Sequence, residues 1–247
     1  MPRIFLPLLK PTHEIRISGE KARYLTTVLR CSVGEEVTVF DGKGLSYRTI
    51  IKGISKKDIV AEIIDITSYD AESPIQITLI QGLLKGEKMD LVIQKTTELG
   101  VSEIIPAVTE RSQVKDTRKV ERWRKIAEDA ARQCGRSMVP VIHESVLFGD
   151  LLASFSGSTA ASHHGIIFWE KGGMRLADAL KMKGDSRSFM IAVGPEGGFT
   201  GEEVRVAESR EFLTASLGKR ILRSETAAIS AVAIVQFLFG DLNSPFQ

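Results

Sequence analysis

The chain has 247 residues, of which 43% are hydrophobic and 26% are charged, a balance typical of globular proteins with one or two domains. No run of about 18 to 20 apolar residues occurs, which excludes a membrane span and favours a cytoplasmic protein. The net charge of +2 does not by itself indicate a nucleic-acid partner, but nine basic residues stand against four acidic ones from Arg111 to Arg136.

Cysteine and histidine are too sparse to indicate a cross-linked or metal-bound fold. Cys31 and Cys134 have no CxxC partner, so we expect free thiols. His163 and His164 are neighbours in the sequence and would point to opposite sides of a strand, which makes shared metal ligation unfavourable. We therefore expect no metal site.

The first seventy residues read as a small β-rich domain with one helix. Short strands are expected at Arg3–Leu6, Glu14–Ile17, Glu36–Phe40, Leu45–Ile51 and Asp58–Ile66, and a helix at 19–30. Strands at this spacing, with glycine-rich turn residues at 41–44, favour a compact barrel. The polar segment 67–74 ends in Pro74 and marks the expected domain boundary.

From residue 71 to residue 247 strands and helices alternate. Apolar strands are expected at Ile75–Ile80, Glu103–Val108, Gly165–Trp169, Ser188–Val193 and Phe212–Leu217. Helices are expected at Glu87–Leu99, Arg118–Cys134, Leu176–Lys181, Glu202–Ser209 and Glu225–Phe239. This alternation predicts an α/β domain with a mostly parallel sheet.

A glycine-rich loop, Gly194-Pro195-Glu196-Gly197-Gly198, directly follows the strand expected at 188–193. Ligands bind at the carboxyl ends of parallel strands, and glycines let backbone amides approach them. Neither G-x-G-x-x-G nor a phosphate-loop motif is present, and Glu196 places negative charge where a phosphate would bind, so a polar or cationic ligand fits better. A tight turn with a solvated Glu196 is the alternative.

A second segment, Leu217 to Thr226, also lies between a strand and a helix. Its Arg223 stands just before the final helix, where it can hold an anionic or polarised oxygen, and Ser224 is the expected N-cap. The alternative is a surface arginine in a capping turn. Two loops of this kind can face one pocket.

Three segments together resemble the RsmE family of SPOUT methyltransferases, which methylate N3 of a uridine in bacterial 16S ribosomal RNA. They are Gly194 to Phe199, Leu217 to Ala227, and Gln94-Lys95-Thr96-Thr97-Glu98-Leu99-Gly100-Val101. The resemblance implies a PUA-like β-barrel RNA-binding domain at 1–70 and a SPOUT methyltransferase domain at 71–247 with a trefoil knot. It also implies bound S-adenosylmethionine, a homodimer, and 16S ribosomal RNA as substrate, within the 30S subunit.

Carried over by position, the resemblance implies a cofactor site built from three loops. Its residues are Phe168, Trp169, Glu170, Gly194, Pro195, Glu196, Gly197, Gly198, Leu217, Gly218, Ile221, Leu222, Arg223 and Thr226. Phe168 and Trp169 have a second interpretation as core residues. For the chemistry, we expect Glu196 to act as base or orienting acceptor and Arg223 to stabilise the uracil anion that forms as N3 loses its proton.

Basic residues in both parts of the chain are candidates for RNA contact. They are Arg16, Arg23, Arg30, Lys85, Arg111, Arg118, Arg122 and Arg136. Arg118 and Arg122 lie opposite the apolar stripe of their predicted helix, so a solvated charged face is the alternative.

Two other classes of protein are compatible with parts of this pattern. In a non-catalytic RNA-binding protein, the glycine loop would be only a turn. A nucleotide-phosphate enzyme would be expected to carry the phosphate-loop lysine or the G-x-G-x-x-G motif that this chain lacks.

Overall fold

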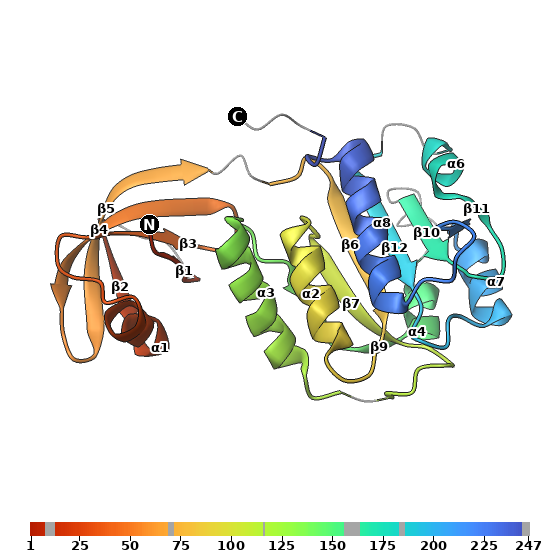
Figure 1. Cartoon of the computed structure of the whole chain (residues 1–247), viewed down its shortest axis with the longest axis horizontal. Coiled ribbons are helices and arrows are strands. Elements are labelled where there is room, and N and C mark those ends of the chain that lie inside the picture. Colours follow the sequence, from red (N-terminus) through yellow and green to blue (C-terminus); the bar gives the residue numbers. More distant parts are fainter. Residues whose placement is uncertain (8–12, 69–71, 116, 156–163, 183–185, 244–247) are drawn as a thin grey trace. The chain divides into compact units, whose positions relative to one another are not determined.

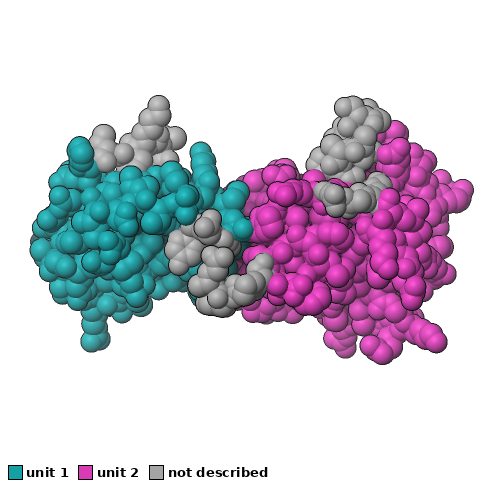
Figure 2. Space-filling model, turned by 90° about the horizontal axis from the view of Figure 1, so that it is seen from above, with its two compact units in different colours: residues 1–72, 131–139 teal, residues 73–130, 140–247 magenta. Residues whose placement is uncertain are grey.

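The chain folds into two compact units. The computed structural model describes residues 1–7, 13–68, 72–115, 117–155, 164–182 and 186–243 (Figure 1). Unit 1 consists of residues 1–72 and 131–139, and unit 2 of residues 73–130 and 140–247 (Figure 2). The middle of the predicted boundary segment, residues 69–71, lies outside the described residues, as does His163.

Unit 1 is built on a five-stranded sheet with the order β1-β3-β4-β5-β2. Its strands are β1 (Arg3–Phe5), β2 (Glu14–Ser18), β3 (Glu36–Phe40), β4 (Leu45–Ile54) and β5 (Asp58–Ser68). Only the β1–β3 pairing is parallel among the described strands of this sheet. Two register shifts between β4 and β5 interrupt the ladder, and such irregularities increase the local bend and twist of a sheet.

Alternating apolar residues of these strands form the core of unit 1. Ile15 and Ile17 of β2 face inward with Val37 and Val39 of β3, and each is at most 2% exposed. Helix α1 (Gly19–Arg23) adds Ala22 and continues into a π-helical turn at Tyr24–Val28. The helical path therefore ends short of the predicted limit at Arg30, which has a positive φ.

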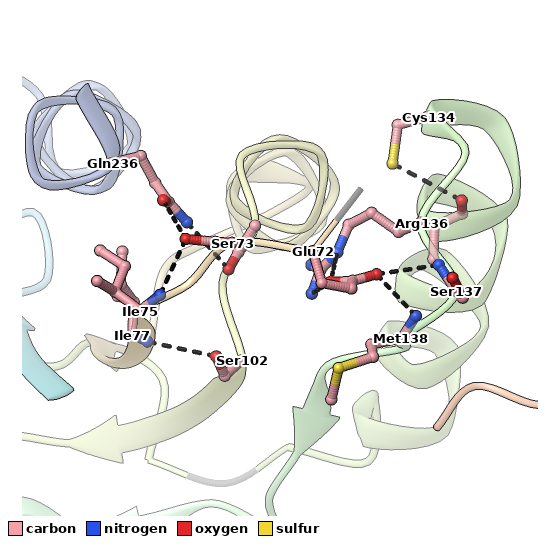
Figure 3. Close-up of polar contacts among 12 residues, drawn as sticks. Glu72, Ser73, Ile75, Ile77, Ser102, Cys134, Arg136, Ser137, Met138 and Gln236 are labelled. Carbon is pink, nitrogen blue, oxygen red and sulfur yellow. Dashed lines mark hydrogen bonds and ion pairs between the residues drawn. The ribbon is translucent and has the colours of Figure 1, made fainter. Parts of the chain in front are cut away.

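The segment 131–139 joins unit 1 through a buried ion pair (Figure 3). Glu72 accepts hydrogen bonds from Nε and Nη2 of Arg136 at 3.0 and 2.9 Å. Its other oxygen accepts from the backbone N–H groups of Ser137 and Met138, each at 2.9 Å. Arg136 is only 6% exposed, so this carboxylate satisfies a charge that the fold has removed from water.

Unit 2 is built on a parallel sheet with the order β11-β13-β10-β12-β6-β7-β8, and β9 pairs with β7. The strands are β6 (Gln76–Gly82), β7 (Glu103–Val108), β8 (Val141–Ile142), β9 (Val146–Leu147), β10 (His164–Phe168), β11 (Met174–Arg175), β12 (Ser188–Val193) and β13 (Leu213–Ser216). Every pairing among the described strands is parallel, as the alternating pattern predicted.

The described helices after residue 73 are α2 (Lys88–Glu98), α3 (Val120–Cys134), α4 (Phe148–Ser154), α6 (Leu176–Lys181), α7 (Gly201–Ser209) and α8 (Ser224–Phe239). Residues 131–134 of α3 belong to unit 1. Helices α2 and α8 lie side by side in front of β6 and β12, while α4 and α7 pack against each other (Figure 1). Strands β10 and β12 are buried along nearly their whole length because helices cover the sheet.

The predicted elements of 75–108 and 188–239 agree with the observed ones to within one or two residues. The short elements β8, β9, α4 and β11 were not predicted. Strands of two residues and a seven-residue helix are too short to show a hydrophobic period.

We predict that Glu72→Ala lowers the free energy of unfolding by about 3–5 kcal/mol, because the buried Arg136 guanidinium loses the carboxylate that it faces. Urea unfolding measures this cost. Glu98→Ala is the control, since the Lys95–Glu98 pair is exposed and contributes about 0–1 kcal/mol. Equal losses in the two variants would contradict the role assigned to Glu72.

Candidate active site

Four adjacent strands of unit 2 end in one row. The register aligns Ala215 of β13 with Phe168 of β10, Phe168 with Val193 of β12, and Val193 with Gln81 of β6. In parallel sheets the loops that leave such a row lie together at one edge, where ligands bind. The strand order therefore brings the loops of the candidate site together at one edge of the sheet.

A cleft of about 570 Å³ lies at this edge. The residues that line it are Lys88, Phe168, Trp169, Glu170, Val193, Gly194, Pro195, Glu196, Gly197, Gly198, Ser216, Leu217, Gly218, Lys219, Arg220, Ile221, Leu222, Arg223, Ser224, Glu225 and Ala227. Thirteen of the fourteen predicted cofactor residues are in this set. Thr226 is the exception: its exposed side chain is not part of the cleft lining.

Gln81 connects two of the loops from inside the protein. Its side chain is fully buried, and its Nε2 lies 3.0 Å from Ser224 Oγ and 3.4 Å from the carbonyl oxygen of Gly194. Ser224 Oγ donates a hydrogen bond to the same Gly194 carbonyl. The start of the glycine loop and the start of α8 are thus held to each other and to the end of β6.

Two glycines permit the close packing of the glycine loop. A Cβ at Gly82 would lie 2.5 Å from the backbone nitrogen of Pro195, closer than side chains allow. Gly198 has φ +66°, and a Cβ there would lie 2.9 Å from the carboxylate of Glu170. The loop therefore packs against β6 on one side and against the loop after β10 on the other.

Arg111 holds the same loop through its carbonyl groups. Its Nη1 donates to the carbonyl oxygens of Gly197 and Phe199 at 3.1 and 3.3 Å. This side chain was predicted to contact RNA. In the structure it also stabilises the conformation of the glycine loop. Phe199 continues the loop into the core, where its ring stacks on Phe148.

Glu196 accepts hydrogen bonds from one lysine side chain and from one backbone N–H group at the start of α2 and in the segment before it. Lys88 Nζ donates to its Oε1 at 2.9 Å, and the backbone N–H of Lys85 donates at 3.2 Å. Burial raises the pKa of the Glu196 carboxyl, but these hydrogen bonds outweigh burial and leave the pKa below its ordinary value of 4.5. A carboxylate held in this way is a weak base, which favours the orienting role predicted for Glu196 over the base.

Two buried polar atoms in the lining lack a hydrogen-bond partner among the described residues. They are the donor Trp169 Nε1 and the acceptor Glu225 Oε2. Buried polar groups are almost always satisfied, so a donor and an acceptor left over in one cleft indicate a ligand with matching groups. Sequence reasoning selected Trp169 but missed Glu225 and Gln81.

The start of α8 differs from the prediction. Arg223 occupies the N-cap with extended backbone angles and makes no side-chain cap hydrogen bond, while Ser224 is the first helical residue. The Ser224 hydroxyl donates to the Gly194 carbonyl instead of capping the helix. The exposed Arg223 side chain is consequently available to the cleft.

The predicted RNA-binding residues fall into two groups. Arg16, Arg23, Arg30, Lys85, Arg111, Arg118 and Arg122 are exposed. Arg122 also pairs with Asp90 at 2.7 Å, which reduces the positive charge it presents. Arg136 requires a correction: it is buried against Glu72 and is a structural residue of unit 1, not a phosphate contact.

The described residues contain no helix long and apolar enough to cross a membrane. Within the same part of the chain, histidine, cysteine and carboxylate side chains form no cluster of three or more that could hold a metal ion.

Comparison with known families matches both parts of the chain. Residues 71–236 match the model of an RNA methyltransferase domain, and residues 17–64 match that of an RNA methyltransferase PUA domain. This chain therefore belongs to the RNA methyltransferase family.

Individual relatives place it within that family. Ribosomal RNA small subunit methyltransferase E from Bacillus subtilis is 32% identical, with 96% of each chain covered. The crystal structure of a ribosomal RNA small subunit methyltransferase E from Neisseria gonorrhoeae bound to S-adenosyl methionine matches with a TM-score of 0.89, 34% identity, and 98% and 99% of the two chains covered. A methyltransferase from Legionella pneumophila in complex with the same cofactor matches with a TM-score of 0.86 and 34% identity over 97% and 98%. These matches favour the catalytic reading over a non-catalytic RNA-binding protein.

We predict that Lys88→Met raises the pKa of the Glu196 carboxyl toward its ordinary value, because the largest stabilising hydrogen bond is lost. Carbon-13 NMR of the Glu196 carboxyl measures the shift. Since the pKa is lowered in the folded state, the wild-type pair stabilises the fold above the unfolded pKa, and this contribution disappears as the pH falls through the folded pKa. Lys95→Met, on the same helix, is the control and leaves the Glu196 titration unchanged; an unchanged titration in Lys88→Met would contradict the assignment.

Proposed function

We propose that this protein transfers the methyl group of S-adenosylmethionine to N3 of a uridine in 16S ribosomal RNA, acting on the 30S subunit. The observation that carries the proposal is the cleft at the ends of β10, β12 and β13, built from the three loops named by the family resemblance. The relatives named above supply the substrate class, a small-subunit ribosomal RNA.

The cleft fits the cofactor in size and in polarity. Its volume of about 570 Å³ lies within the range of small-molecule sites, roughly 300–1,000 Å³. Trp169 Nε1 offers a buried donor to a ligand that carries acceptor groups. S-adenosylmethionine supplies an electrophilic methyl group on its sulfonium. The glycine loop and Leu217–Leu222 would hold it, while apolar Phe168 and Leu222 exclude water.

Arg223 is the residue that we assign to charge stabilisation. Neutral uracil carries a proton on N3, and its departure places negative charge on the flanking carbonyl oxygens. A guanidinium at the mouth of the cleft and the unpaired N–H groups at the start of α8 can stabilise that charge. Glu196, held by Lys88, would orient ligand groups without accepting the proton.

Unit 1 and exposed basic residues of unit 2 are proposed to bind the RNA backbone. In unit 1, Arg23 lines a groove together with Thr26, Ser55, Lys56 and Lys57. Lys56 and Lys57 were not among the predicted contacts because they lie in a turn with no motif. In unit 2, Lys85, Arg111 and Arg118 are exposed, and such side chains contribute the salt-dependent part of RNA affinity.

The proposal includes a homodimer, implied by the resemblance, and a cytoplasmic location. Ile234, Phe237 and Leu238 of α8 and Leu242 beyond it expose apolar side chains, and an exposed apolar group of this kind suits a second copy of the chain. The trefoil knot in the C-terminal part stays a prediction.

We predict that Arg223→Ala reduces methyl transfer by about 10²–10³-fold, the usual loss when one group that stabilises transition-state charge is removed. The assay supplies labelled S-adenosylmethionine and 30S subunits that lack the modification, then maps the labelled nucleotide. Affinity for S-adenosylmethionine, measured by calorimetry, is expected to stay at the wild-type level. The helix start is preserved because the Arg223 side chain makes no cap hydrogen bond.

Arg205→Ala on α7 is the matched control, since Arg205 is exposed and pairs only locally with Glu202 among the described residues. It is expected to leave turnover unchanged. Full turnover in Arg223→Ala would refute the charge-stabilising role. Label found on a different RNA, or no label with the wild-type protein, would refute the proposed function itself.

A further inference from the structure

Among the described residues, three carboxylates line the cleft. They differ in their exposure and in the hydrogen bonds that they already accept. Glu196 is bonded to Lys88 and to the backbone of Lys85. Glu170 is exposed on the loop after β10. Glu225 is only 9% exposed, and its Oε2 has no hydrogen-bond partner among the described residues.

The position of Glu225 explains how a carboxylate is tolerated there. It lies in the first turn of α8, a helix of 16 residues, where the helix dipole favours negative charge. The dipole alone does not account for an orphan oxygen, because a first-turn carboxylate normally bonds to water or to helix N–H groups. A buried acceptor that no protein group satisfies points to a donor on a ligand.

The chemistry of uracil indicates which donor this is. The N3–H group of uracil lies between two carbonyl groups, so the residue that holds a carbonyl oxygen and the residue that accepts the N3 proton must both reach the same cleft. Arg223 and Glu225 are two positions apart at the start of α8, and both line the cleft.

Resting on the function proposed above, we infer that Glu225 is the acceptor of the uridine N3 proton and the general base of the reaction. As the proton passes from N3 to Oε2, the N3 electron pair attacks the methyl carbon of the cofactor. The sulfur–methyl bond breaks, and sulfur takes its electron pair to leave as the neutral thioether of S-adenosylhomocysteine. The proton then passes from Glu225 to water, so the products are N3-methyluridine, S-adenosylhomocysteine and one proton.

Glu225→Gln tests this role, because the amide keeps the shape of the side chain but cannot take the proton. We expect methyl transfer to 30S subunits at saturating S-adenosylmethionine to fall by about 10²–10⁴-fold, the usual contribution of a general base. We expect the affinity for S-adenosylmethionine to be unchanged by calorimetry. The residual rate is expected to rise about tenfold per pH unit at alkaline pH, as solvent removes the N3 proton in place of Glu225.

Glu202→Gln is the matched control, since Glu202 lies in the first turn of α7 and faces solvent. It is expected to keep the wild-type rate and pH profile, and urea unfolding verifies that both variants are folded. Weaker cofactor binding with unchanged turnover at saturation would overturn the inference and assign Glu225 to the cofactor. Unchanged rate and affinity would also overturn it. Failure of the wild-type protein to methylate the subunit would instead be a failure of the proposed function.

Discussion

Gln81 is a fully buried amide at the end of the central strand β6, and its hydrogen bonds determine how the candidate site is assembled. Parallel strands bring the loops to one edge, but they do not fix how far the loops stand from each other. The amide of Gln81 does so by bonding to the first residue of α8 and to the first carbonyl of the glycine loop. Gly82 next to it leaves room for Pro195 to pack against the strand. A buried amide N–H group is costly unless it is bonded, which ties the stability of this edge to the closure of the loops.

The polar groups of the cleft divide into those that the protein satisfies and those that it leaves for a ligand. Glu196 is bonded to Lys88, and Arg111 is bonded to loop carbonyls, so both maintain the shape of the walls. Trp169 and Glu225 each retain one buried polar atom without a protein partner. This division separates the groups that position the loops from the groups that contact cofactor and substrate.

The sequence predicted the sheet and the position of the cleft well, because both depend on local signals. Apolar runs such as Ser188–Val193 define strands, and the glycine loop follows directly. The sequence failed where a role depends on distant contacts. Arg136 was predicted to bind RNA because it ends the segment from Arg111 in which basic residues outnumber acidic ones, yet it is buried against Glu72, which is 64 positions away. Ser224 has the residue type of an N-cap, but Gly194 competes for its hydroxyl. Glu225 carried no signal of its own, since burial and a missing partner are visible only in the folded chain.

Calorimetric titration of S-adenosylmethionine into the wild-type protein and into variants of two glutamines tests whether Gln81 assembles the cofactor cleft. Gln81→Leu removes the amide that joins the loops, whereas Gln76→Leu changes an exposed glutamine on the same strand. We expect one-site binding by the wild-type protein and by Gln76→Leu. We expect binding weaker by about tenfold or more in Gln81→Leu, in line with about 1–3 kcal/mol for buried hydrogen bonds. A wild-type protein that does not bind the cofactor, or a folded Gln81→Leu variant that binds it equally well, would contradict the role assigned to Gln81.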